Sequence, residues 1–163
     1  QWARLVEGRG KVDATEVRIG ILDGLADRGK RARLDNITIV ENPAGLYDGI
    51  LVDAPCSGSG TWRRQPHLKW YVKPETIATF ARTQLEILTT TVARLKPDGL
   101  LIYATCSLSH HENQDVVAAF LKAHGAFKPV PPATMQAGFD GLGTTILPGT
   151  LNTDGFYVAV LRR

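Results

Sequence analysis

The chain has 163 residues, enough for one domain with a buried core, and its content of 44% hydrophobic and 21% charged residues excludes a disordered or low-complexity protein. The net charge of +3 permits an anionic partner but does not require one. No apolar run approaches the length of a membrane span, and the start of the chain does not resemble a signal peptide.

The first third of the chain alternates short apolar runs with one helical segment. Residues 11–16 predict a strand that ends in an acid, and residues 17–33 predict a helix with a basic outer face. Further strands are expected at residues 37–40 and 49–55. Strands that alternate with helices favour an α/β fold with a mostly parallel sheet.

The remaining two thirds continue this alternation after a long loop. A loop, a helix, a strand, a second helix and a closing strand are expected, in that order, at residues 57–73, 74–95, 100–105, 109–125 and 156–161. A turn at residues 96–99 (KPDG) precedes the first of these two strands. Residues 109–112 (SHHE) have the spacing of a capping box and predict the start of the second helix. The closing strand would add an antiparallel edge to the sheet.

The only two cysteines, Cys56 and Cys106, each follow an apolar strand directly. Ligands bind at the carboxyl ends of strands in open α/β sheets, so both cysteines lie where a site is expected. Two cysteines do not form a disulfide framework, and we expect reduced thiols in a cytoplasmic protein. The spacing of cysteines and histidines argues against zinc. A redox pair, two buried structural thiols, and a nucleophile with an accessory thiol remain open.

Glu16 ends the first predicted strand, where dinucleotide-binding folds place a carboxylate that holds a ribose. A solvated acid at a strand end is the plain alternative. The glycine loop that should accompany a ribose-binding acid is missing, because residues 8–10 (GRG) precede a strand instead of following one. Residues 57–60 (SGSG) follow a strand, but a long loop separates them from the next helix, so they give little support for a phosphate site.

The loop over residues 57–73 mixes cationic side chains with two tryptophans. These residues are Trp62, Arg63, Arg64, His67, Lys69 and Trp70. Cations hold a phosphate backbone, and aromatic rings stack on unpaired bases, so the mixture suits RNA. A basic loop whose tryptophans pack on the core explains the same residues equally well.

The segments around both cysteines carry a more specific signal than their spacing. Residues 53–60 (DAPCSGSG) and 64–70 (RQPHLKW) resemble the fourth motif of the Sun/Fmu (RsmB-like) family of S-adenosylmethionine-dependent RNA cytosine-5 methyltransferases. Residues 103–108 (YATCSL), with 112–113 (EN) just beyond, resemble its sixth motif. The resemblance covers roughly residues 11–163 and points to bacterial enzymes that act on small-subunit ribosomal RNA.

This resemblance implies a Rossmann-like class I methyltransferase fold that uses S-adenosylmethionine. It implies that Cys106 is the nucleophile and that Cys56 is the thiol that helps release the product. Asp53 would contact the target cytosine near the methyl group of the cofactor. Glu16 and Pro55 would also bind the cofactor, Glu16 at its ribose. RNA contacts are expected from four residues of the basic loop: Arg63, Arg64, Lys69 and Trp70.

The chain departs from the family pattern in two places. The first strand and its glycine-rich loop would precede residue 1, so we expect a single catalytic domain over residues 1–163 that is incomplete at its N-terminus. Glu41 and Asn42 replace the Gly-Asp pair expected after the third strand of the family. We therefore predict that this chain alone binds S-adenosylmethionine weakly or not at all.

Two other functions remain open. A DNA cytosine-5 methyltransferase would use Cys56, in a Pro-Cys motif, as the nucleophile and would leave Cys106 without a role. The Thr-Cys-Ser motif at residues 105–107 favours RNA over DNA. A catalytically inactive RNA-binding module is the second alternative. The expected partner is RNA, ribosomal RNA in the favoured case, and neither a metal nor a membrane is expected.

Overall fold

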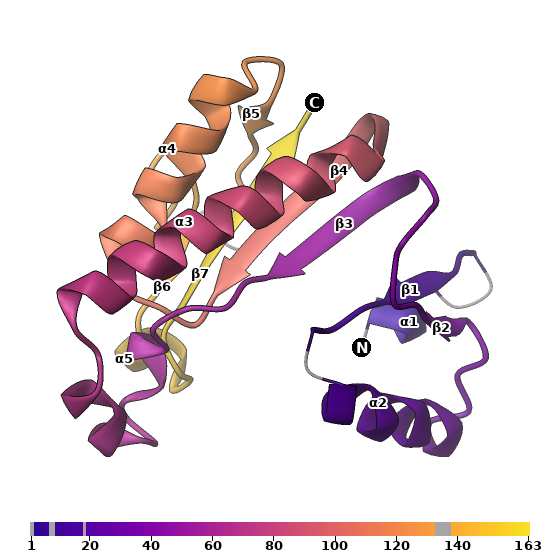
Figure 1. Ribbon diagram of the computed structural model, residues 1–163, viewed down its shortest axis with the longest axis horizontal. Coiled ribbons are helices and arrows are strands. Elements are labelled where there is room, and N and C mark those ends of the chain that lie inside the picture. The colour runs from indigo at the N-terminus through magenta and orange to yellow at the C-terminus, as the bar shows by residue number, and fades with distance from the viewer. Residues whose placement is uncertain (1, 7–8, 18, 133–137) are drawn as a thin grey trace. The chain divides into compact units, whose positions relative to one another are not determined.

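The computed structural model describes residues 2–6, 9–17, 19–132 and 138–163. The chain divides into two compact units, Gln1–Gly45 and Leu46–Arg163 (Figure 1). None of the helices in the described ranges is long and apolar enough to cross a membrane. A single catalytic domain over residues 1–163 stays a prediction.

The first unit pairs two short strands. Its elements are α1 (Trp2–Leu5), β1 (Val12–Ala14), α2 (Ile19–Arg31) and β2 (Ile37–Ile39). Strands β1 and β2 are parallel, and the Asn36 side chain donates hydrogen bonds to the carbonyls of Ala3 at 2.7 Å and Gly10 at 3.3 Å. The predicted helix and both predicted strands of this unit are therefore confirmed, whereas the glycine run at residues 8–10 begins outside the described residues.

The second unit is built on a five-stranded mixed sheet. Its elements are β3 (Tyr47–Asp53), η1 (Ser59–Thr61), η2 (Pro66–Trp70), α3 (Pro74–Thr91), η3 (Val92–Arg94), β4 (Leu95–Thr105), η4 (His110–Glu112), α4 (Gln114–Ala123), β5 (Lys128–Pro129), β6 (Thr144–Ile146), α5 (Pro148–Leu151) and β7 (Phe156–Arg162). The strand order is β3-β4-β7-β5, and β6 also pairs with β7. Strands β3 and β4 are parallel, whereas β7 is antiparallel to β4, β5 and β6. The sheet thus has the antiparallel edge that the sequence predicts.

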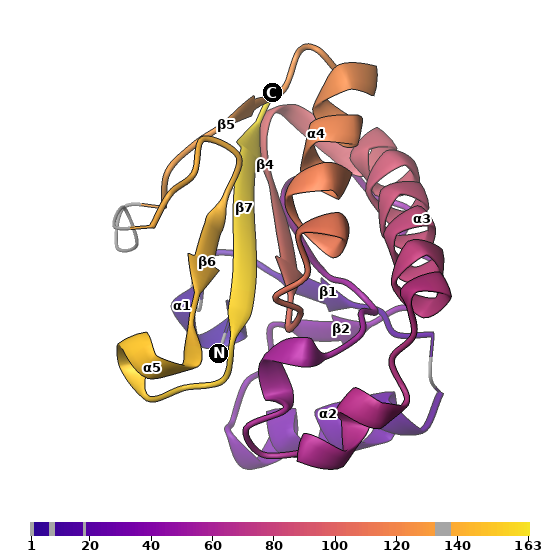
Figure 2. The same cartoon turned by 90° about the vertical axis from the view of Figure 1, so that its left-hand side faces the viewer.

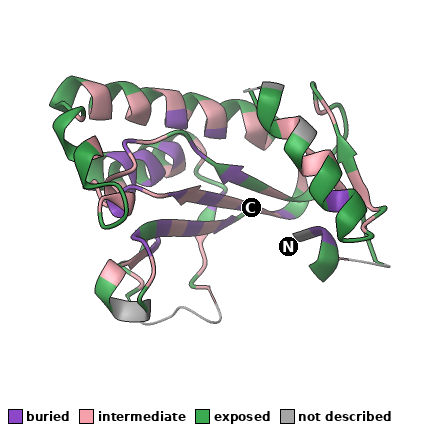
Figure 3. Cartoon of the chain, turned by 90° about the horizontal axis from the view of Figure 1, so that it is seen from below, coloured by how far each residue is buried: buried purple, intermediate pink, exposed green. Residues whose placement is uncertain are grey.

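Helices α3 and α4 cover one face of this sheet (Figure 2). On β4, Leu101, Tyr103 and Thr105 are buried and alternate with half-buried neighbours, as expected for a strand with one face against a core. Leu88 of α3 and Phe120 of α4 are fully buried in the same hydrophobic cluster. Figure 3 shows the buried residues on the strands and on the sides of the helices turned toward them.

The helix predicted to begin at residues 109–112 begins later. These residues lead into the short turn η4, and α4 starts at Gln114. The Ser109 side chain makes no capping hydrogen bond, and the Glu112 side chain is buried among partners distant in sequence. The capping-box prediction is therefore wrong, because tertiary contacts occupy the Glu112 carboxylate.

Strand β4 begins earlier than predicted. The turn expected at residues 96–99 lies inside β4, which starts at Leu95 opposite Tyr47 before the register shifts. Asp98 takes a positive φ of 63° there. The extra residues between Leu95 and Leu100 therefore interrupt the regular pairing of β4 with β3, as the extra residue of a β-bulge does.

Candidate active site

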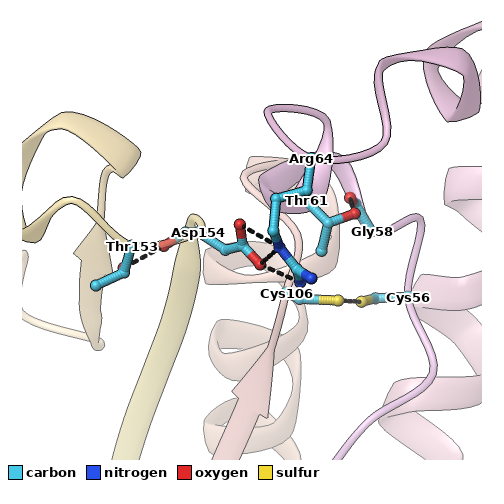
Figure 4. A network of polar contacts seen from close by, with 7 residues as sticks. All are labelled: Cys56, Gly58, Thr61, Arg64, Cys106, Thr153 and Asp154. Atoms are coloured by element: carbon cyan, nitrogen blue, oxygen red, sulfur yellow. Dashed lines mark hydrogen bonds and ion pairs between the residues drawn. The ribbon is translucent and has the colours of Figure 1, made fainter.

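The two cysteines meet at the carboxyl ends of neighbouring parallel strands. Strand β3 ends at Asp53 and pairs there with Ala104 of β4, so the loops that leave both strands start together. The Sγ atoms of Cys56 and Cys106 lie 3.3 Å apart and point toward each other (Figure 4). Both residues are half-buried and free of disulfide bonds. The pair is therefore less enclosed than structural thiols in a core.

The hydrogen bond between the two thiols separates their acidities. It lowers the pKa of Cys106 to about 7, although burial and the negative charge of Asp53 both raise this pKa. The same hydrogen bond, together with burial, raises the pKa of Cys56. These opposite directions favour ionisation of Cys106 over Cys56, and a protonated Cys56 can donate the hydrogen bond to the Cys106 thiolate.

Asp53 and Pro55 lie between the end of β3 and Cys56. Both are exposed, and Asp53 is close enough to Cys106 to raise the pKa of that thiol. The Pro55 carbonyl accepts a hydrogen bond from the Gln84 amide at 2.8 Å, which ties the segment to α3. A carboxylate with access to solvent therefore stands near the thiol pair.

A buried carboxylate joins the two cysteine loops. Glu112 is fully buried, and its Oε2 accepts hydrogen bonds from the hydroxyls of Ser57 at 2.5 Å and Ser107 at 2.7 Å. Its Oε1 accepts a hydrogen bond from the backbone N–H of Ser57 at 2.7 Å. The two serines directly follow the two cysteines in the sequence, so one side chain connects both loops.

Backbone hydrogen bonds connect the cysteine loops with the loop before β7. The Gly60 N–H donates to the Cys106 carbonyl, and the Gly155 N–H donates to the Gly60 carbonyl, each at 2.9 Å. A Cβ on Gly60 would lie 2.1 Å from the carbonyl oxygen of Gly155, so this crossing requires glycine. The close approach also brings Asp154, the neighbour of Gly155, to the site.

Arg64 and Asp154 form an ion pair near Cys106 (Figure 4). Nε of Arg64 donates to Oδ1 and Oδ2 of Asp154 at 2.9 and 2.7 Å, and Nη2 also contacts Oδ2. The hydrogen bond to Asp154 and the negative charge of Asp154 raise the pKa of Arg64, and the charge of Cys106 raises it further. In turn, Arg64 lowers the pKa of Asp154. Asp154 is buried, whereas the Arg64 side chain is 59% exposed. A fixed cation therefore faces solvent at the site.

The other residues expected to contact RNA lie on the surface of the basic loop. Arg63 and Lys69 are exposed, and the exposed fraction of Trp70 is 78%. Nζ of Lys69 lies 4.9 Å from the centroid of the Trp70 ring, within the range of a cation–π contact. The alternative in which both tryptophans pack on the core is wrong for Trp70, and Trp62 is half-buried.

Glu16 follows β1 in the first unit and is half-buried. Its contact with a ribose stays a prediction. Within the described ranges, no group of three or more His, Cys, Asp or Glu side chains could hold a metal ion.

Sequence patterns alone give no site role to Gln84, Ser107 and Asp154, and they give Glu112 only a helix-capping role. Ser107 and Glu112 lie in segments that resemble the family, so a signal for these two exists in the sequence. The partners of Glu112 and Asp154 are remote, because Glu112 reaches a residue 55 positions away and Asp154 reaches one 90 positions away. Only the fold shows these contacts.

The chain matches known methyltransferases in sequence. It is 44% identical over 117 residues to ribosomal RNA small subunit methyltransferase B of Vibrio vulnificus, which covers 71% of this chain and 26% of that protein. It is 33% identical over 177 residues to the probable ribosomal RNA small subunit methyltransferase B of Bacillus subtilis, which covers 99% of this chain and 39% of that protein. The chain thus spans less than half the length of these relatives.

The structural comparison agrees with the sequence comparison. The crystal structure of NSun6 from Pyrococcus horikoshii with SFG matches with a TM-score of 0.84 at 26% identity and covers 99% of this chain and 43% of that chain. The similarity confirms the predicted α/β fold of the class I methyltransferases. The family model described as 16S rRNA methyltransferase RsmB/F matches residues 4–162. The chain therefore belongs to the RsmB/F family of 16S rRNA methyltransferases, whose motifs surround its two cysteines.

Proposed function

We propose that this chain carries the catalytic site of an enzyme that transfers a methyl group from S-adenosylmethionine to C5 of a cytosine in small-subunit ribosomal RNA. The observation that carries the proposal is the Cys56–Cys106 pair, 3.3 Å apart, in which the pKa of Cys106 is lowered to about 7. C5 of cytosine is a poor nucleophile until a thiolate adds to C6, and Cys106 is suited to that addition. The names of both relatives support ribosomal RNA as the substrate.

In this proposal the protein performs addition, stabilisation and release. The Cys106 thiolate adds to C6 of the cytosine, and the electrons displaced from the ring double bond make C5 nucleophilic. N3 takes up a proton from water, and the Asp53 carboxylate shares that proton as a hydrogen-bond acceptor and so stabilises the charge that develops on the ring. Water takes the C5 proton, the electrons of the C5–H bond form the double bond between C5 and C6, and the bond between C6 and Cys106 breaks with its electrons on the sulfur, which restores the aromatic ring and the Cys106 thiolate. The Cys56 thiol donates a hydrogen bond to the departing sulfur and so assists release.

Two carboxylates, one in each unit, have the chemistry expected of residues that bind S-adenosylmethionine. Glu16 and Asp53 are carboxylates near the ends of strands, and carboxylates accept hydrogen bonds from ribose hydroxyls and attract a positively charged sulfonium. We assign the ribose to Glu16 and the region near the methyl group to Asp53 and Pro55. When bound, this cofactor supplies an electrophilic methyl group. The presence of SFG, an analogue of S-adenosylmethionine, in the NSun6 structure supports S-adenosylmethionine as the kind of cofactor.

The basic loop is the proposed RNA contact. Arg64, held by Asp154, offers its remaining N–H groups to the RNA near Cys106, while Arg63 and Lys69 offer positive charge to phosphates. The exposed ring of Trp70 can stack on a base next to the target. A target base has to leave its stack to reach the thiols, and such a surface stabilises the unstacked strand.

Methyl transfer tests the proposal. The protein, given radiolabelled S-adenosylmethionine and small-subunit ribosomal RNA, should label C5 of cytosine, and Cys106→Ser should abolish the label. Transfer to DNA that is lost in Cys56→Ser would favour the DNA enzyme instead, although the raised pKa of Cys56 argues against that role. RNA binding without transfer to either polymer would favour an inactive module.

A further inference from the structure

The buried Glu112 carboxylate accepts four hydrogen bonds, two at each oxygen. Oε1 accepts from the Ser57 N–H at 2.7 Å and from the Gln84 amide at 3.3 Å. Oε2 accepts from the hydroxyls of Ser57 at 2.5 Å and Ser107 at 2.7 Å. The backbone is held as well, because the Tyr103 hydroxyl donates to the Glu112 carbonyl at 2.5 Å. These partners lie on α3, on β4 and in the loops that follow β3 and β4.

These contacts place the Glu112 carboxylate between the two cysteine loops. Ser57 and Ser107 each follow one cysteine directly, so the carboxylate holds the backbone N–H of Ser57 and the side-chain hydroxyls of both serines beside the two thiols. We propose that Glu112 is a positioning residue that sets the 3.3 Å separation of the Cys56 and Cys106 sulfur atoms and thereby the reactivity of Cys106. This inference rests on the proposed function, in which Cys106 is the nucleophile.

The arrangement requires an acceptor at both carboxylate oxygens. Both partners at Oε1 are N–H donors, and both partners at Oε2 are hydroxyls that donate to it. A glutamine N–H₂ group would lose its partners on the Oε1 side, and on the Oε2 side it would force both hydroxyls to turn and accept instead of donate. A buried donor that loses its partner is costly, so the loops of Ser57 and Ser107 would move apart until they find other partners. The thiols would then no longer hold their hydrogen bond.

The acidity of Cys106 reports on this positioning. Four titratable side chains surround this thiol: Cys56, Asp53 and Arg64 from the β3 side and Glu112 after β4. The hydrogen bond from Cys56 is the largest contribution that lowers the pKa of Cys106. The negative charge of Glu112 raises it, so removing that charge alone would make Cys106 more acidic. A positioning role and a purely electrostatic role therefore predict shifts of opposite sign in Glu112→Gln.

The experiment measures alkylation of Cys106 by iodoacetamide as a function of pH, read by mass spectrometry of the Cys106 peptide in the full chain. Wild type should reach half its maximal rate near pH 7. Glu112→Gln should move this midpoint upward, toward about 8.5, and lower the rate at pH 7 roughly tenfold. Asp115→Asn, which alters an exposed carboxylate paired with His110 and His111, is the matched control and should leave the midpoint unchanged.

An unchanged or lowered midpoint in folded Glu112→Gln would overturn the inference. If that variant does not fold, Ser107→Ala decides, because it removes one donor and leaves the carboxylate in place. An upward shift in Ser107→Ala supports the inference, and an unchanged midpoint overturns it. Alkylation needs neither RNA nor cofactor, so a shifted midpoint in a protein that transfers no methyl group would reject the proposed function and keep the positioning role.

Discussion

The pKa of Cys106 is lowered mainly by a hydrogen bond from a neutral thiol and not by a nearby positive charge. Reactive cysteines are often activated by a histidine, a lysine or a helix N-terminus. Here the hydrogen bond with Cys56 makes the largest contribution, and it outweighs burial and the charge of Asp53. The reactivity of one cysteine therefore depends on the presence of the other, which gives Cys56 a role before any product is released.

The pH dependence of alkylation in single-cysteine variants tests this coupling. In Cys56→Ala the hydrogen bond is lost, so the midpoint for Cys106 should rise from near 7 toward the ordinary thiol value of about 8.5. In Cys106→Ala the pKa of the remaining Cys56 should fall but stay above the ordinary thiol value, since burial still raises it. A Cys56→Ala profile with its midpoint still near 7 would show that another group activates Cys106.

The ion pair of Arg64 and Asp154 should contribute to stability as well as to the site. Asp154→Asn leaves Arg64 without its charged partner, and we expect the free energy of unfolding to fall, because Asp154 is buried and its carboxylate accepts hydrogen bonds from Arg64. Asp48→Asn is the control, because Asp48 pairs with Lys96 but is 89% exposed, so little change is expected. Urea denaturation measures both, and equal losses in the two variants would contradict the account.

Local sequence patterns predict the strands and helices that carry the site, but not all of the sheet. The apolar runs that become β3 and β7 are visible because a buried strand needs them. Strands β5 (Lys128–Pro129) and β6 (Thr144–Ile146) are not visible, since they are short, lie in a segment rich in Gly and Pro, and are formed by pairing with β7. Glu112 shows the same limit for side chains, because a capping pattern in the sequence is overridden by partners on other elements.

Position 60, where the loop after β3 contacts Gly155 and the Cys106 carbonyl, should not accommodate any residue larger than glycine. Gly60→Ala would place a Cβ 2.8 Å from the Cys106 carbonyl oxygen and closer still to Gly155, so the loops have to separate. We expect a loss of about 1–3 kcal/mol in the free energy of unfolding, as for overpacked cores, together with loss of methyl transfer. Gly125→Ala is the control, because nothing lies within 4 Å of its added Cβ. A fully stable and active Gly60→Ala protein would contradict the described crossing.

At the scale of the whole molecule, the net positive charge and the exposed ring of Trp70 predict how the proposed RNA binding responds to salt. If Arg63, Arg64 and Lys69 each neutralise one phosphate, the logarithm of the binding constant should fall with the logarithm of salt concentration with a slope of about −2. Lys69→Ala should reduce this slope by about 0.7. Trp70→Ala should weaken binding by about 1–3 kcal/mol and leave the slope unchanged, since stacking releases no ions.

Fluorescence anisotropy with single-stranded RNA at several salt concentrations measures these changes. Lys122→Ala, an exposed cation on α4, is the control and should alter neither affinity nor slope beyond the general effect of one charge. A Trp70→Ala protein that binds as tightly as wild type would contradict the stacking role.

The assignment of the two thiols is tested by trapping the covalent intermediate. The full-length polypeptide, S-adenosylmethionine and small-subunit ribosomal RNA are incubated with Cys56→Ala or Cys106→Ala and resolved on a denaturing gel. Since Cys106 is the proposed nucleophile and Cys56 assists release, Cys56→Ala should accumulate a protein–RNA adduct and Cys106→Ala should form none. An adduct that appears only in Cys106→Ala would reverse the two roles and contradict the account.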